Sequence, residues 1–110
     1  MIISIQDAVG SSQKVIVKTQ EAVADHSNVI ISTGVSQQLL ASNNNRSGFL
    51  LQNNGTNTLF INTLNVPASA MPGSFKVAPG AYFPPTDYPV TYHQVNVMGT
   101  ASDTFTVIEW

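Results

Sequence analysis

The chain is a succession of short segments rich in Val, Ile, Phe, Tyr and Thr, separated by clusters of Gly, Pro and Asn. Helical spacing of apolar residues is nearly absent. Residues 104–110 alternate most clearly, with Phe105, Val107 and Glu109 on one side of an extended chain. Short strands between regular turn signals predict an all-β fold, in the form of an antiparallel sandwich or barrel.

The expected strands cover residues 2–6, 14–19, 28–33, 35–40, 48–52, 58–62, 74–77, 90–98 and 104–110. We predict a hairpin from residues 48–62, because Asn54-Gly55 can supply the positive φ angles of a tight turn. Ala78-Pro79-Gly80 predicts another turn. Residues 82–89 predict an aromatic surface loop, since their prolines exclude a central strand. A brief helical turn near residues 20–25 would be too short to stand alone.

The length allows one domain, residues 1–110. A hydrophobic share of 43% is enough for a core.

Charge is scarce, at 9% of residues against roughly 25% in typical soluble domains. A polar surface without ions can be buried in a contact without the desolvation cost of unpaired charges, so it suits extensive interfaces. The basic residues are Lys14, Lys18, Arg46 and Lys76, which are too widely spaced to neutralise a run of phosphates. Nucleic acid is therefore not an expected partner.

The chain offers no stretch of ~20 apolar residues, so we expect no membrane partner. Its first residues lack the basic region and cleavage site of a secretory signal, which predicts synthesis and use without export. There is no cysteine, so no disulfide framework or thiolate metal site is available.

Residues that could carry chemistry are dispersed. His26 and His93 are far apart, and neither has a second ligand at metal-binding spacing. The six carboxylates form no pair by spacing, and no serine lies in a nucleophile-elbow motif. We therefore expect no enzyme activity, no metal and no cofactor.

Four aromatic residues, Tyr82, Phe83, Tyr88 and Tyr92, surround the prolines near residue 85. They can cap one end of the sandwich, or they can form a platform that stacks on a ligand such as a sugar. The sequence leaves both alternatives open.

Five blocks together resemble a strand pattern of phage virion proteins: residues 43–53 (NNNRSGFLLQN), 59–62 (LFIN), 77–80 (VAPG), 95–99 (VNVMG) and 105–110 (FTVIEW). The similarity spans roughly residues 36–110. With its length and charge-poor composition, the chain looks most like the capsid decoration proteins, also called cement or staple proteins, of short-tailed, double-stranded-DNA phages.

This resemblance implies a single antiparallel, jelly-roll-like β-sandwich formed by residues 36–110, with residues 1–35 as an N-terminal arm or added strands. It also implies a virion protein, made in the cytoplasm of a host bacterium, that binds the outer surface of the capsid. Its partners would be the major capsid protein and itself, in a homodimer or other symmetric oligomer, and it would hold neighbouring capsid subunits together. The alternative is a receptor- or carbohydrate-binding module of a phage tail or fibre, with the four aromatic residues as its platform.

Two residues of the resembling blocks have a physical role of their own. Arg46 precedes a core strand and Glu109 lies near the end of the last one, so we expect a charge-assisted pair that ties them together. Gly48 is expected to allow an unusual backbone angle or a close approach. The interface candidates are the aromatic residues and Met1, Ile2 and Ile3, since residues 1–6 could add a strand to the sheet of a neighbouring subunit.

Overall fold

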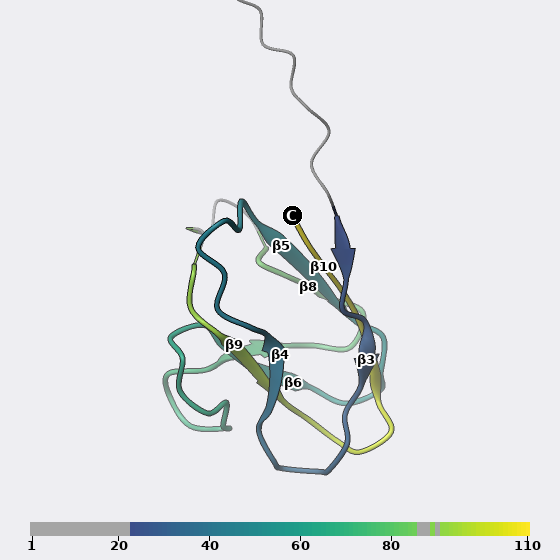
Figure 1. Ribbon diagram of the computed structural model, residues 1–110. Helices are drawn as coiled ribbons and strands as arrows, with labels where there is room; N and C mark the ends of the chain where they lie inside the picture. Colours follow the sequence, from purple (N-terminus) through teal and green to yellow (C-terminus); the bar gives the residue numbers. More distant parts are fainter. Residues whose placement is uncertain (1–22, 86–88, 90) are drawn as a thin grey trace, which may run out of the picture.

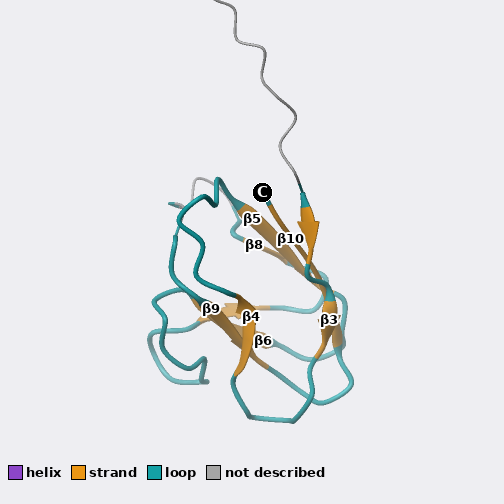
Figure 2. Cartoon of the chain, viewed as in Figure 1, coloured by secondary structure: helices purple, strands orange, loops and turns teal. Residues whose placement is uncertain are grey.

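The period-two segments of the chain form two antiparallel sheets packed face to face, as Figures 1 and 2 show. In this computed structural model, residues 23–85, 89 and 91–110 are described. None of the described residues is helical. The predicted all-β sandwich is thus confirmed, while the jelly-roll connectivity stays a prediction.

The first sheet, sheet I, has the strand order β2-β10-β5-β8, and β3 pairs with β10 beside β2. Its strands are β2 (Ala24–Asp25), β3 (Asn28–Val29), β5 (Phe49–Asn53), β8 (Tyr82–Phe83) and β10 (Thr104–Glu109). Sheet II has the order β4-β9-β6-β7. Its strands are β4 (Gln37–Leu40), β6 (Leu59–Asn62), β7 (Phe75–Val77) and β9 (Val95–Met98).

The predicted alternation of β10 is observed. Exposed and buried residues alternate from Thr104 to Val107, and Ile108 is half-buried before the buried Glu109. The strand pairs along its length with β5, from Phe105 opposite Asn53 to Glu109 opposite Phe49. Side chains from both sheets meet in one apolar core, in which Leu51, Ile61 and others are fully buried. Each fully buried aliphatic side chain of this size contributes roughly 1.5–3 kcal/mol to stability.

The predicted hairpin of residues 48–62 is wrong, because β5 belongs to sheet I and β6 to sheet II. The connection crosses the sandwich instead of folding back. Gly55 does not have a positive φ; a Cβ there would lie 2.6 Å from the side chain of Asp103, so the glycine permits a close approach. The Asn53 side chain accepts a hydrogen bond from the Gly55 N–H at 2.9 Å, which holds the chain where it crosses from sheet I to sheet II.

The described part of residues 1–35 contributes strands to the sandwich. β2 and β3 lie along one side of β10, and Ile30 is buried in the core. The helical turn predicted near residues 20–25 is wrong where it is described, because Ala24 and Asp25 form β2. The strands predicted at residues 2–6 and 14–19 lie outside the described residues.

The strand predicted over residues 90–98 is shorter, since β9 begins at Val95. The carbonyls of Thr91 and His93 accept hydrogen bonds from the Arg46 side chain, so this stretch serves a side-chain contact in place of a strand ladder.

The chain reverses between β7 and β8 at the predicted turn, where Gly80 has a φ of 79° that favours glycine. Residues 82–83 form a short strand at the outer position of sheet I and not a loop. A strand at this position tolerates the prolines that follow.

Candidate functional site: a neutral surface and an apolar groove

Arg46 is the centre of a polar network at one end of the sandwich. Its Nε donates to Glu109 Oε2 at 2.7 Å, so the predicted pair is present. Its terminal nitrogens donate to the carbonyls of Ala41, Thr91 and His93 at 2.6–3.0 Å. The Arg46 side chain is wholly buried. It therefore joins the segments that flank β4 and β9 in sheet II to β10 in sheet I.

Glu109 receives further partners on its other sides. Asn43 Nδ2 donates to Glu109 Oε2 at 3.2 Å, and His26 Nε2 lies 3.0 Å from Oε1. Burial acts to raise the pKa of Glu109, but the hydrogen bonds from Arg46 and Asn43 and the charge of Arg46 outweigh it. The pKa of Glu109 consequently lies below its ordinary value.

This lowered pKa predicts a loss of stability in acid. The stabilisation is complete above the ordinary pKa of 4.5 and is lost as pH falls through the lower pKa of the folded state. We expect wild type to melt well above Glu109→Gln at neutral pH, and the gap between their melting temperatures to narrow as the pH falls below 4.5. Circular dichroism melts of both proteins across this range test the prediction, and a gap that stays constant would contradict it.

Gly48 lies where the chain passes the C-terminal residue. A Cβ at Gly48 would lie 2.8 Å from Trp110 Cζ2. The main chains of the two residues exchange hydrogen bonds of 3.0 and 3.1 Å. The close approach expected for Gly48 is therefore observed.

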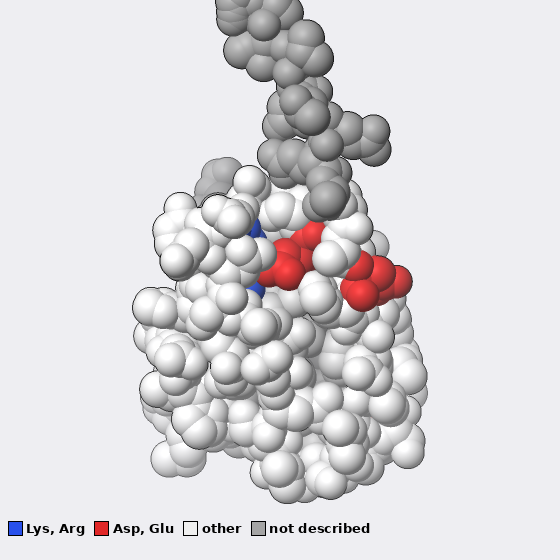
Figure 3. Space-filling model, in the orientation of Figure 1, with Lys and Arg blue, Asp and Glu red and all other residues white. Residues whose placement is uncertain are grey.

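Charged side chains are rare on the surface of the sandwich. The described residues include five, of which Arg46 and Glu109 are buried against each other. Asp103 is partly buried and accepts two hydrogen bonds from one asparagine. Among the residues described, only Asp25 and Lys76 are exposed and charged. Figure 3 shows the coloured atoms gathered at one end of the visible face, which is otherwise neutral.

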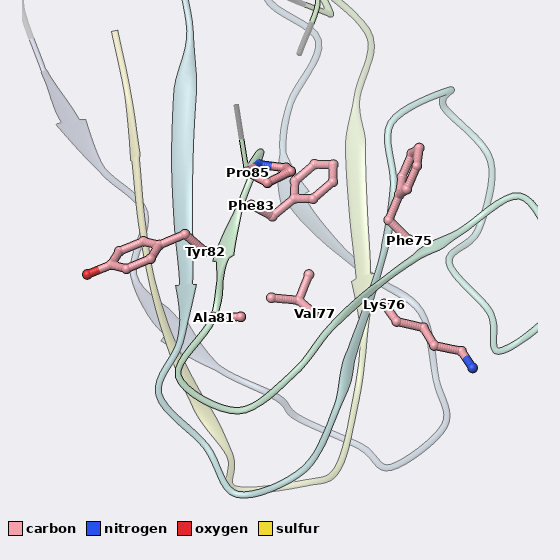
Figure 4. Close-up of a pocket in the computed structure, with 7 residues that line it drawn as sticks. All are labelled: Phe75, Lys76, Val77, Ala81, Tyr82, Phe83 and Pro85. Carbon is pink, nitrogen blue, oxygen red and sulfur yellow. The ribbon is translucent and has the colours of Figure 1, made fainter. Parts of the chain in front are cut away.

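An apolar groove of about 240 Å³ lies between β7 and β8, the outer strands of the two sheets. Figure 4 shows its lining, with Val77, Ala81 and Phe83 directed into the hollow. Tyr82 and Lys76 point away from it on opposite sides. The groove thus opens between the inner faces of the two sheets.

Phe75 forms one wall of this groove. It alternates with Lys76 along β7 and so shares the inner face with Val77, yet 48% of its surface is exposed. Its ring lies 5.3 Å from that of Phe83, measured between centroids. A residue of the inner face is exposed here because no described strand covers this flank of the sandwich.

The aromatic interface candidates are separated by the structure. Tyr82 and Tyr92 are exposed, at 55% and 53%. Phe83 was named as an interface candidate, but it pairs with Leu51 across β8 and β5 and is only 4% exposed. A stacking platform can therefore not include Phe83. The remaining candidates, Tyr88, Met1, Ile2 and Ile3, lie outside the described residues.

Phe75 was not among the residues that the sequence singled out. The Phe-Lys-Val order of β7 is the signal that could have placed Phe75 on the same side of the strand as the buried Val77. No feature of the pattern shows that this flank is open, because openness depends on which strands end each sheet.

Within the part of the chain that the structure describes, no three His, Asp or Glu residues are grouped so that they could hold a metal ion. The same residues include no helix that is long and apolar enough to cross a membrane. Comparison of the chain with protein-family models, with curated proteins and with solved structures finds no match.

Proposed function

We propose that the protein is a structural component of a phage virion, which binds the outer surface of the capsid and stabilises contacts between major capsid protein subunits. The observation that carries this proposal is the neutral surface, on which Asp25 and Lys76 are the exposed charges among the described residues. Amides and hydroxyls can be buried against a shell without the desolvation cost of unpaired ions. The resemblance of residues 36–110 to capsid decoration proteins supports the same function.

Apolar residues on the loop between β6 and β7 support a contact of this kind. Leu64 and Met71 on this loop are 65% and 68% exposed. Interfaces typically combine an apolar core, from which charged residues are depleted, with a polar rim. This loop is therefore our candidate for the centre of the contact with the capsid.

Binding of this type gains strength from repetition. If the protein is a dimer, its second subunit binds the shell at the high effective concentration set by the first, which raises affinity by ~10²–10⁴ where the geometry permits. A modest affinity per subunit is then enough, and no catalytic group is needed.

The test mixes the recombinant protein with empty shells of the major capsid protein encoded in the same genome. We expect the protein to sediment with the shells and to raise the temperature at which they dissociate. The double variant Leu64→Asp and Met71→Asp should bind at least about tenfold more weakly, because each change places a charge in the contact.

The matched control is Ile31→Asp, which places the same charge at a residue that is 72% exposed and outside the loop. It should bind like wild type. Failure of folded wild-type protein to bind shells would overturn the proposal, and binding to purified tails or to glycans would favour the tail or fibre alternative.

A further inference from the structure

The outer edge of β8 has main-chain groups directed away from its sheet. Asn53 N–H donates to the Ala81 carbonyl at 3.0 Å, and the Asn53 carbonyl accepts the Gly80 N–H at 2.7 Å, so Asn53 occupies a hydrogen-bonded position of the antiparallel ladder, opposite a bulge. Hydrogen-bonded and non-hydrogen-bonded pairs alternate along such a ladder. The next pair, Tyr82 with Gln52, is therefore non-hydrogen-bonded, and the Tyr82 N–H and C=O point away from β5. An edge of this kind can accept an added strand.

The groove lies directly beside this edge. All the side chains directed into it are apolar, as Figure 4 shows. Its volume of about 240 Å³ is below the usual 300–1,000 Å³ of small-molecule sites. It suits apolar side chains from a segment that runs along β8.

The first residues of the chain have the composition of such a segment. Residues 1–6 read Met-Ile-Ile-Ser-Ile-Gln and carry no charged side chain. In an extended segment Ile3 and Ile5 would share one side, and both are β-branched, which favours a strand.

The start of the described chain lies at the end of sheet I towards which β8 runs. Ala24 of β2 pairs with Glu109, which pairs with Phe49 at the start of β5. Two residues further along β5, Leu51 pairs with Phe83, whose side chain lines the groove. The described chain therefore begins at the end of sheet I where the chain runs from Phe83 towards Pro85.

The preceding segment is long enough to bring residues 2–6 to the edge of β8, in its own subunit or in a second copy. The 16 residues from 7 to 22 can span at most roughly 55 Å when extended. The distance across sheet I from β2 to β8 is only about 14 Å, three strand spacings. If two copies exchange their N-terminal segments, the two contacts between a segment and a groove are equivalent, as a two-fold symmetric dimer requires.

We propose that the groove between β7 and β8 binds residues 2–6 of a second copy of the chain, as a strand added to the edge of β8 with Ile3 and Ile5 in the groove. The inference rests on the dimer included in the proposed function and identifies the contact that forms it. Each subunit donates its N-terminal segment and accepts that of its partner.

Cross-linking between two variants tests this contact, and the absence of native cysteine makes it unambiguous. Full-length Ile3→Cys is mixed with a size-tagged Phe75→Cys under oxidising conditions. We expect a disulfide-linked heterodimer on a non-reducing gel. Ile31→Cys, which is exposed elsewhere, replaces Phe75→Cys in the control and should give little of this product.

Analytical ultracentrifugation provides the second measurement. We expect wild type to dimerise, and both Phe75→Asp and the double variant Ile3→Asp and Ile5→Asp to dimerise at least about tenfold more weakly. A mixture of the two should regain association, because one intact segment then meets one intact groove. Melting curves show that each variant is folded.

A wild-type monomer, or variants that dimerise as wild type does, would overturn the inference. So would a disulfide confined to single chains in a protein that carries both Ile3→Cys and Phe75→Cys, because the segment would then bind its own groove. None of these measurements involves the capsid: if the cross-link fails while shells still bind the protein, the inference fails and the proposed function stands.

Discussion

Replacing Arg46 with Ala is expected to lower the free energy of unfolding by about 3–5 kcal/mol, because removal of one partner leaves the other charge of a buried pair uncompensated. The change also removes the donor for the carbonyls of Ala41, Thr91 and His93. At about 4 °C per kcal/mol for a domain of this size, the melting temperature should fall by roughly 12–20 °C. Thermal or denaturant unfolding measures the loss.

Lys76→Ala is the matched control, since it removes the same charge from an exposed position. It should change stability by less than about 0.5 kcal/mol. Arg46→Lys keeps the charge but cannot reproduce the planar fork of donors, so it should recover only part of the stability that Arg46→Ala loses. Hydrogen exchange should rise along β10 in Arg46→Ala, and an unchanged melting curve would contradict the structural role of the pair.

Replacing Asn53 with Ala is expected to cost about 2–4 kcal/mol, because a buried amide with several hydrogen bonds is lost and its partners lose their donor or acceptor. Asn53 is completely buried. Its Nδ2 donates to the carbonyls of Asn57 and Val77 at 2.8 and 2.9 Å, and its Oδ1 accepts the Gly55 N–H. These bonds hold the crossing between the sheets and fasten β5 to β7.

The adjacent Asn54 supplies the control for this second change. Asn54 is exposed, and its amide donates to the Thr106 hydroxyl at 2.7 Å. Asn54→Ala should therefore cost less than about 1 kcal/mol. Urea unfolding of the two variants separates the cases, and equal losses would show that the crossing does not depend on the buried amide.

The two buried residues explain how a sandwich with so few charges is held together at its ends. Arg46 joins the sheets at one end through main-chain carbonyls and Glu109. Asn53 joins them towards the other end of β5. These polar side chains link the two sheets from within the protein, so the links between the sheets require no charged residues on the surface.

Local pattern was sufficient to predict much of the strand content and one long-range contact. Alternation places Glu109 on the same side as Val107 and Phe105, and Arg46 precedes a core strand, so the two residues were expected to pair. In a chain with four basic residues, the choice of Arg46 was correct. These inferences succeed because they depend only on which side of a strand a residue occupies.

The partners of each strand were decided by the tertiary structure. Asn53-Asn54-Gly55 is compatible with a hairpin or with a crossing, and only the burial of the Asn53 amide between the sheets selects the crossing. Phe83 stands among prolines, but its pairing with Leu51 turns it into the core. The groove exists because β7 and β8 end their sheets on the same flank. A period of two distinguishes the inner from the outer side of a strand and carries no information about which strands lie beside it. The sequence by itself therefore determined a charge-poor β protein whose strands have an inner and an outer side. The packing of the two sheets decided which flank is open.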